Sequence, residues 1–292
     1  MVILHMSGHI FYPALWALFV ALAVGQSITQ TDLVSGVVHA QDVSLAQGDQ
    51  MAYVASYFQK KVYLVDLESK AVTTLTTTSG GAISCAMGNG VLFVVDRDSN
   101  LICKADLLVS SNCTTVASVT HPHQIALPES RDVIYVTERN QNRVRRLRLK
   151  ADNTLLSSDV AVEGITEPWG LAVSRDGTVL YVGEDAEAGA DKIWKVVVSA
   201  SGTSTNKVDI ATGLDRVLGL VLNRAETVLY ASEYARKNIV RIELVSGTYD
   251  KTTLVSGMER APLGLALPAA EDRLLVASPD GYVVLIAGLP VA

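Results

Sequence analysis

A short hydrophobic signature recurs six times along the chain, each time as apolar residues between polar segments. The copies are Ala52-Tyr53-Val54, Leu92-Phe93-Val94, Ile134-Tyr135-Val136, Leu180-Tyr181-Val182, Leu229-Tyr230-Ala231 and Leu274-Leu275-Val276. Their central residues lie 40, 42, 46, 49 and 45 positions apart. A period in the forties indicates a repeat architecture, in which each unit buries its apolar face against its neighbours. The pattern therefore predicts six similar units within one domain.

The fourth unit shows the pattern of elements inside a repeat. An apolar segment at 170–173 is followed by a polar turn that contains Asp176-Gly177, a strong hairpin signal. The signature at 180–182 gives a second strand, the alternating segment 192–196 a third, and a polar segment near 208–211 a fourth. Four short strands per unit are typical of a propeller blade. We predict an all-β fold, a six-bladed β-propeller of four-stranded blades.

The two ends of the chain suggest how the ring closes. The last unit ends with an apolar segment at 282–286, which fits a third strand, and only a short tail follows. The missing outer strand has a counterpart near the start, because 31–36 (TDLVSG) closely matches 253–257 (TLVSG). We therefore expect an N-terminal strand within 28–36 to complete the last blade, which makes 26–292 a single propeller domain and leaves no open sheet edge.

The first 25 residues read as a targeting segment. Residues 10–24 are almost wholly apolar, too few to span a bilayer comfortably, and the small residues Ala21, Ala23 and Gly25 lie at the end of the run. This predicts a signal peptide over 1–25 and a protein that is secreted or lumenal in the secretory pathway. The segment before the run has no Lys or Arg, so an uncleaved membrane anchor through 10–25 stays open as the alternative.

Cysteine placement and charge bear on compartment and partners. Cys103 and Cys113 flank a probable hairpin, so a disulfide between them is one interpretation, and three unpaired thiols including Cys85 are the other. Asn112 begins a glycosylation sequon. The net charge of -6 excludes nucleic acid as the expected partner. Contact with a membrane is expected only through an uncleaved leader, and the expected state is a monomer.

The units resemble the NHL-repeat branch of six-bladed propellers over about residues 28–288. The matching segments are Pro168-Trp169-Gly170-Leu171-Ala172-Val173, Asp176-Gly177, Leu180-Tyr181-Val182, Tyr135-Val136-Thr137-Glu138, Asn140 and Asn142-Arg143-Val144. A more distant resemblance is to the gluconolactonase and senescence-marker type propellers. The resemblance implies the fold, whereas propellers of this shape include lyases, lactonases, synthases and binding modules.

The resemblance also implies where a metal site would lie. In the enzymatic relatives, Asn and Asp of Pro-Asn-Gly-Leu and Pro-Asp-Gly-Leu bind a divalent metal, together with an acid in a Glu-Gly-Pro segment. The corresponding positions here are Trp169 and Leu263, which offer no oxygen to a hard cation, and the first unit has His39-Ala40-Gln41-Asp42 instead. We therefore expect a non-catalytic protein and assign no cofactor.

The predicted function is that of a secreted or lumenal binding module that takes a protein or glycan ligand at the rim of its channel mouth. The rim is expected to consist of residues at the starts of inner strands and in the loops between second and third strands. The candidates are His39, Asp42, His123, Gln124, Trp169, Glu184, Arg216 and Leu263.

The alternative is a lactonase- or lyase-like hydrolase with a rebuilt divalent-metal site at the channel mouth. Its candidate catalytic residues are His121, His123 and Asp42, and its candidate ligands for calcium or another divalent metal are Asp42, His123 and Glu184. The structural interpretation of His121 and His123 is that one ring lies in solvent and the other is hydrogen-bonded to a loop carbonyl. Glu138, Glu184 and Glu233 share one repeat position, which favours a structural bond to amides of the following turn over an acidic crown that attracts cations.

Overall fold

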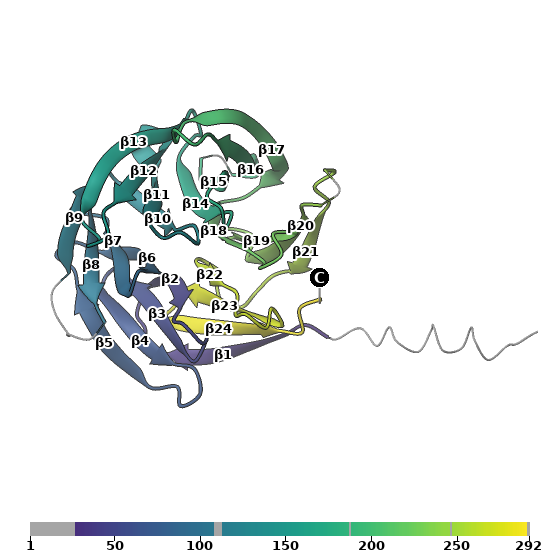
Figure 1. Cartoon of the computed structure of the whole chain (residues 1–292). Helices are drawn as coiled ribbons and strands as arrows, with labels where there is room; N and C mark the ends of the chain where they lie inside the picture. The colour runs from purple at the N-terminus through teal and green to yellow at the C-terminus, as the bar shows by residue number, and fades with distance from the viewer. Residues whose placement is uncertain (1–26, 108–112, 187, 246, 291–292) are drawn as a thin grey trace, which may run out of the picture.

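Six four-stranded antiparallel sheets form a closed ring in the computed structural model, which describes residues 27–107, 113–186, 188–245 and 247–290 (Figure 1). Each sheet runs from an inner strand beside the central channel to an outer strand at the perimeter. The helical content of the described residues is one 3-10 turn, Arg139–Gln141. The prediction of an all-β, six-bladed propeller of four-stranded blades is confirmed.

Each strand position recurs once per blade. The inner strands are β2 (Ala40–Leu45), β6 (Ala82–Gly88), β10 (Pro122–Ala126), β14 (Pro168–Val173), β18 (Val217–Leu222) and β22 (Leu265–Ala266). The second strands are β3 (Met51–Ser56), β7 (Val91–Asp96), β11 (Val133–Glu138), β15 (Val179–Glu184), β19 (Val228–Glu233) and β23 (Arg273–Ser278). The third strands are β4 (Lys61–Asp66), β8 (Leu101–Asp106), β12 (Arg143–Leu149), β16 (Asp191–Val198), β20 (Asn238–Glu243) and β24 (Tyr282–Ala287). The outer strands are β5 (Val72–Thr77), β9 (Thr114–Ser118), β13 (Leu155–Glu163), β17 (Ser204–Leu214), β21 (Lys251–Val255) and β1 (Thr29–Ser35).

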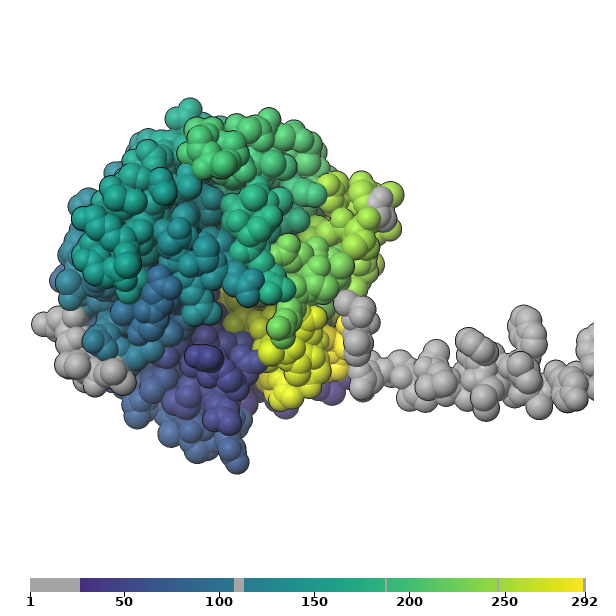
Figure 2. Space-filling view, viewed as in Figure 1, coloured from purple at the N-terminus to yellow at the C-terminus, as the bar shows by residue number. Residues whose placement is uncertain are grey.

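The ring closes through its last blade, as the sequence predicts. Strand β1 pairs antiparallel with β24, from Thr29 opposite Ala287 to Ser35 opposite Tyr282. The earliest and latest described segments, purple and yellow, are therefore neighbours in Figure 2. Because the first strand completes the last sheet, both ends of the described chain are held by ladder hydrogen bonds.

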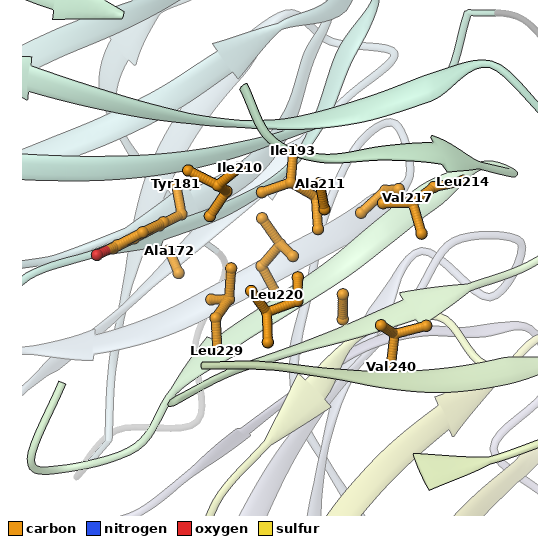
Figure 3. Close-up of a cluster of buried hydrophobic side chains, with 12 residues drawn as sticks. Ala172, Tyr181, Ile193, Ile210, Ala211, Leu214, Val217, Leu220, Leu229 and Val240 are labelled. Atoms are coloured by element: carbon orange, nitrogen blue, oxygen red, sulfur yellow. The ribbon is translucent and has the colours of Figure 1, made fainter. Parts of the chain in front are cut away.

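Apolar clusters between neighbouring blades hold the ring together. Figure 3 shows the cluster between the fourth and fifth blades, where Tyr181 and Ile193 on one side face Leu220, Leu229 and Val240 on the other. Ile193 and Leu229 have no exposed surface. Burying a side chain of this size contributes about 1.5–3 kcal/mol. The six signatures lie on the six second strands, so the repeat in the sequence supplies these contacts between blades.

In five blades a bulge interrupts the pairing between the inner strand and the second strand near the start of the inner strand. The bulge determines toward which mouth of the channel the neighbouring side chains point. The register slips between Ala40 and Asp42, between Ala82 and Ser84, and between Val217 and Gly219, with longer slips in β10 and β14. Such bulges redirect side chains locally. The end of the channel at which inner strands begin is called here the start-side mouth, and the opposite end is called the end-side mouth.

Acidic residues at the ends of second strands hold the loops that lead into each blade. Asp96 accepts hydrogen bonds from the amides of Ser79 (3.0 Å) and Gly80 (2.9 Å), and Glu138 accepts one from Thr120 (3.1 Å). Asp96 and Glu138 therefore bind amides of the preceding loop, since the second strand runs antiparallel to the inner strand and ends beside its start. Glu233 instead accepts hydrogen bonds from the side chains of Arg236 and Asn238, which follow it.

The structure also places the cysteines. Cys103 of β8 and Cys113 form a disulfide with a Cα–Cα distance of 5.5 Å, and Cys85 of β6 is a buried thiol. The predicted leader, residues 1–25, and the sequon residue Asn112 lie outside the described residues. Within the described part of the chain, no helix is long and apolar enough to cross a membrane.

Candidate functional site

The start-side mouth holds a pocket of about 190 Å³. Its wall comes from the starts of inner strands and from residues that directly follow second strands. The lining residues are His39, Gln41, Tyr57, Ile83, Arg97, Trp169, Arg216, Leu218, Tyr234, Leu263 and Pro279. The pocket thus combines a floor of aliphatic side chains with aromatic and basic walls, and none of these lining residues is a carboxylate.

Left-handed backbone presents two of these side chains. His39 and Arg216, which line the pocket, directly precede inner strands and have φ of 55° and 58°, and Glu167, which does not line it, precedes β14 with φ of 43°. Residues other than glycine adopt this conformation at a cost of about 1–2 kcal/mol, and such positions concentrate at functional sites. The same conformation at His121, with φ of 46°, precedes β10. A strained left-handed residue therefore recurs before several inner strands at the start-side mouth, and the packing of the surrounding blades stabilises it.

Two arginine–tyrosine pairs flank the pocket. The Arg97 guanidinium lies 5.4 Å from the centre of the Tyr57 ring, and the Arg216 guanidinium lies 4.9 Å from that of Tyr234. Arg216 Nε also binds the buried Asp185 Oδ1 at 2.7 Å. Among the described residues Arg97 has no carboxylate partner. The charge of Arg97 is therefore available to a ligand, whereas that of Arg216 is partly satisfied within the protein.

An exposed aromatic group extends the pocket outwards. Phe58 is 65% exposed, and among the described residues it is the one aromatic member of the exposed large hydrophobic side chains. Its ring contacts the His39 ring edge-on at 4.0 Å between centroids and lies 5.2 Å from the Tyr57 ring. The three rings form a connected apolar surface at the rim, of the kind that marks contact sites on soluble proteins.

His123 lies buried beneath this mouth, in contact with Trp169 at 4.3 Å between ring centroids. Its Nδ1 lies 3.1 Å from the carbonyl oxygen of His121. Because a carbonyl only accepts, Nδ1 carries the proton, and Nε2 of the neutral ring is an acceptor that has no partner among the described residues. Burial, with smaller contributions from the nearby charges of Arg97 and Arg139, lowers the pKa of His123 to about 3. His121 is exposed, so the pair has the arrangement of the structural interpretation, with one ring in solvent and one bonded to a loop carbonyl.

The end-side mouth opens on a larger cavity of about 390 Å³. Its walls are largely aliphatic and include Ile125, Leu171, Leu220 and Leu265, while Arg175, Arg224 and Glu226 line it from turns after inner strands. Asp42 and Gln124 lie at its base. The cavity therefore has an apolar wall with a small polar group at its inner end.

Asp42 is the centre of that polar group. Its Oδ2 accepts hydrogen bonds from Ser84 Oγ (2.7 Å), Gln124 Nε2 (2.9 Å) and the Cys85 amide (3.3 Å), and its Oδ1 accepts one from the Val43 amide (3.0 Å). The network joins the inner strands of the first three blades. Burial raises the pKa of Asp42 to about 6, against the opposing effect of these donors.

Glycine makes room for this carboxylate. A Cβ on Gly264 would lie 2.1 Å from Asp42 Oδ1 and 2.6 Å from its Cα. The equivalent positions in the first three blades are Asp42, Ser84 and Gln124, and those in the last three are Gly170, Gly219 and Gly264. Polar side chains thus occupy one half of this layer, and backbone from the other half approaches them closely.

The eight rim candidates separate into different places. His39, Trp169, Arg216 and Leu263 line the start-side pocket, whereas Asp42 and Gln124 line the end-side cavity. Glu184 is buried and accepts hydrogen bonds from Trp194 Nε1 (2.8 Å) and the Thr166 amide (3.4 Å). The candidate metal ligands Asp42, His123 and Glu184 therefore each bond to different residues of the protein. The described residues contain no group of three His, Cys, Asp or Glu that could hold a metal.

Tyr57, Arg97 and Tyr234 were not among the site residues predicted from the sequence. All three directly follow the last residue of a second strand, so they share one repeat position with Arg139, Asp185 and Pro279. Alignment of the six units one residue beyond the acidic position would have found them. The repeat spacing therefore contains the signal that locates these residues, at the position that follows Asp96, Glu138 and Glu233.

Comparisons with known proteins establish the fold and leave the family open. No protein-family model matches the chain, and no curated protein matches it in sequence. A gluconolactonase from Xanthomonas campestris is similar in structure, with a TM-score of 0.74 and 14% identity over 91% of this chain and 92% of that one. An auxiliary nutrient binding protein from Bacteroides ovatus has a TM-score of 0.71 and 14% identity over 90% of this chain and 77% of that one.

A chain of a nidogen/laminin complex is also similar, with a TM-score of 0.65 and 18% identity over 78% of this chain and 85% of that one. At these identities the likeness shows the fold alone. The predicted resemblance to gluconolactonase-type and NHL-like propellers is confirmed at that level. The named neighbours include an enzyme, a binding protein and a protein complex, so the fold is compatible with both catalysis and binding.

Proposed function

We propose that the protein is an exported binding module that captures a protein partner at its start-side mouth. The observation that carries this proposal is the gathering of Arg97, Tyr57, Trp169 and the exposed Phe58 around one pocket. Arginine and aromatic residues are enriched at the centres of protein interfaces, where a few side chains carry most of the binding energy.

The size of the pocket favours a macromolecular ligand. Pockets that enclose a whole drug-sized molecule measure about 300–1,000 Å³, and the start-side pocket measures about 190 Å³. It therefore accommodates a single protruding group while the rest of the ligand covers the rim around Phe58. A glycan that presents one sugar is the competing ligand, and the experiment below distinguishes the two.

The chemistry of the lining indicates what that protruding group is. Ile83, Leu218 and Leu263 supply aliphatic contact, and Arg97 supplies a guanidinium without a carboxylate partner among the described residues. A side chain with an apolar body and an acidic or carbonyl end satisfies both. The export part of the proposal is supported by the apolar segment at 10–24 and by the Cys103–Cys113 disulfide.

The metal-dependent hydrolase has less support. Trp169 and Leu263, at the positions that carry oxygen ligands in the enzymes the sequence resembles, lie in the start-side pocket. Asp42, His123 and Glu184 have separate hydrogen-bond partners in the protein. The geometry thus favours binding at the start-side mouth.

The test is affinity capture from extracellular and lumenal fractions with the wild type and three variants. Phe58→Ser and Arg97→Gln alter the start-side mouth, and Val245→Ser is the matched control because Val245 is also highly exposed, at 70%. We expect a protein that the wild type and Val245→Ser retain and that both mouth variants lose. Equal capture by all four proteins contradicts the proposal. Retention that survives protease and is lost on enzymatic deglycosylation of the ligand fraction identifies a glycan instead.

A further inference from the structure

The end-side mouth has the features of a second, separate ligand site. Its cavity of about 390 Å³ falls within the range of about 300–1,000 Å³ that holds small molecules. The walls are largely aliphatic, with Asp42 and Gln124 at the inner end and the charged residues Arg175, Arg224 and Glu226 at the outer end. This arrangement, an apolar pocket with a few convergent polar groups, is typical of small-molecule sites.

The polar end carries a negative charge that the protein does not neutralise. Asp42 is 2% exposed, and among the described residues no lysine, arginine or histidine forms an ion pair with it. Buried carboxylates are ordinarily paired, because burial of an isolated charge is costly. The hydrogen bonds from Ser84, Gln124 and two backbone amides are all made by neutral donors. A positive partner for Asp42 is therefore missing from the described chain.

Acceptor capacity remains at the same place. Asp42 Oδ2 accepts three hydrogen bonds, whereas Oδ1 accepts only one, and a carboxylate oxygen has two lone pairs. Gln124 gives its Nε2 to Asp42, and its Oε1 accepts no hydrogen bond from the described residues. Both side chains line the cavity. Asp42 and Gln124, which line the inner end of the cavity, thus each keep an oxygen with unused acceptor capacity.

The positive charges of the arginines at the outer end of the cavity are partly balanced by nearby carboxylates, so they repel a bound cation only weakly. Arg175 is paired with Glu129, with its guanidinium 3.0 Å from the carboxylate, and its backbone amide binds Glu226. Glu226 lines the cavity beside Arg224. The outer end therefore carries charges of both signs, whereas the inner end carries only Asp42.

We propose that the end-side cavity binds a small ligand with a protonated primary amine, which sits between Asp42 and Gln124, and with an apolar body against Leu171, Leu220 and Leu265. An ammonium group has three donors and no acceptor, so it satisfies the free acceptor sites of both side chains and neutralises the buried charge. The aliphatic walls gain by covering an aliphatic or aromatic body. This site is independent of the protein partner proposed for the start-side mouth.

Calorimetric titration with probe amines tests the proposal. The probes are phenethylamine and hexylamine, and phenethyl alcohol and phenylacetate match the first probe in shape with a neutral and an anionic end. At neutral pH we expect both amines to bind and the alcohol and the acid to bind at least about tenfold more weakly, the loss typical of a missing charge-assisted hydrogen bond. Failure of both amines to bind up to millimolar concentration overturns the proposal, as does equal affinity for the amine and the alcohol.

Variants locate the binding. Asp42→Asn should weaken phenethylamine about ten- to hundredfold, while Asp209→Asn, an exposed change on the outer strand β17, should have no effect. If Asp42→Asn does not fold, Ala86→Phe replaces it, because Ala86 lines the cavity without joining the Asp42 network. We expect Ala86→Phe to fold and to exclude the amine. Unchanged affinity in a folded Asp42→Asn or Ala86→Phe protein contradicts the site.

Discussion

The two mouths of the channel are built from adjacent residues of the same inner strands, yet their chemistry differs. Gln41 and Trp169 line the start-side pocket, while Asp42 and Gln124, each one position further along the repeat, line the end-side cavity. The start-side mouth has aromatic rings and guanidinium groups, whereas the end-side mouth has largely aliphatic walls, the buried Asp42 carboxylate at its inner end and charges of both signs at its outer end. A single step along a bulged strand therefore decides which end of the channel a side chain serves.

The same comparison explains why two candidates that lie close in the repeat do not act together. The sequence hypothesis joined Asp42 with His123 in one metal site. His123 packs under Trp169 toward the start-side mouth, and Asp42 binds Gln124, the residue that follows His123. The two mouths should therefore respond differently to pH, to substitution and to ligands, and the following predictions test that difference in order of expected effect.

The largest effect is expected from His123 on acidification. Its pKa is about 3 in the folded protein against 6.5 in the unfolded chain, so the unfolded state binds the extra proton first. Stability is therefore complete above pH 6.5 and is lost as pH falls toward 3, by about 1.4 kcal/mol per pH unit and about 5 kcal/mol in all.

Denaturant unfolding of the wild type and His123→Gln between neutral and acidic pH measures this loss. The variant lacks the titrating ring, so the wild type should lose stability relative to it as pH falls. A constant difference between the two proteins across this range would show that His123 is accessible to protons in the folded state.

Asp42 should produce the opposite trend at the other mouth. Its pKa is about 6 in the folded protein against 3.8 in the unfolded chain, so the folded state holds the proton longer. The stability contribution is present below pH 3.8 and is lost as pH rises through 6, which amounts to about 3 kcal/mol. The free energy of unfolding of wild type minus that of Asp42→Asn should fall over this window. A difference that rises with pH would mean that the four donors outweigh burial.

Substitution of glycine should reveal how tightly the carboxylate is enclosed. Gly264→Ala places a Cβ 2.6 Å from the Asp42 Cα, whereas Gly170→Ala places one no closer than 3.1 Å to any neighbour. Overpacking against backbone costs about 1–3 kcal/mol, so we expect about 3 kcal/mol for Gly264→Ala and about 1 kcal/mol for Gly170→Ala. The midpoints of chemical denaturation measure both, and equal losses would show that the layer around Asp42 adjusts freely.

The smallest effect on stability is expected at the rim of the start-side mouth. Phe58 is 65% exposed, so Phe58→Ser should change the free energy of unfolding by less than about 0.5 kcal/mol. If Phe58→Ser no longer captures the partner, the loss is then due to the missing contact between Phe58 and the partner and not to unfolding. A stability loss of several times that size would place Phe58 in the structural part of the mouth.

The sequence predicts the fold well, because periodicity is a property of the whole repeat. The six signatures, the Asp176-Gly177 turn and the match between 31–36 and 253–257 lead to the blade, the strand order and the closing strand β1. The site is harder to predict. The mouth toward which the Asp42 and His123 side chains point depends on the bulges in β2 and β10. A register shift of one residue would reverse this direction, and the amino-acid composition gives no sign of where a bulge lies.

The arginines at the start-side mouth illustrate a second limit. Arg97 and Arg216 have the same charge in the sequence, and only the fold shows that Asp185 pairs with Arg216 while no described carboxylate pairs with Arg97. Whether a charge is free depends on contacts between neighbouring blades, such as that between Asp185 of the fourth blade and Arg216 of the fifth. The spacing of the repeat can locate the position of such a residue, but it does not give its partner.

The most direct test of the difference between the mouths is a crystallographic screen of the wild-type protein with cationic, neutral and anionic fragments of similar size. The account predicts that amines gather in the end-side cavity against Asp42 and that carboxylates gather in the start-side pocket against Arg97. Amines in the start-side pocket, or fragments of all charges in both places alike, would contradict it.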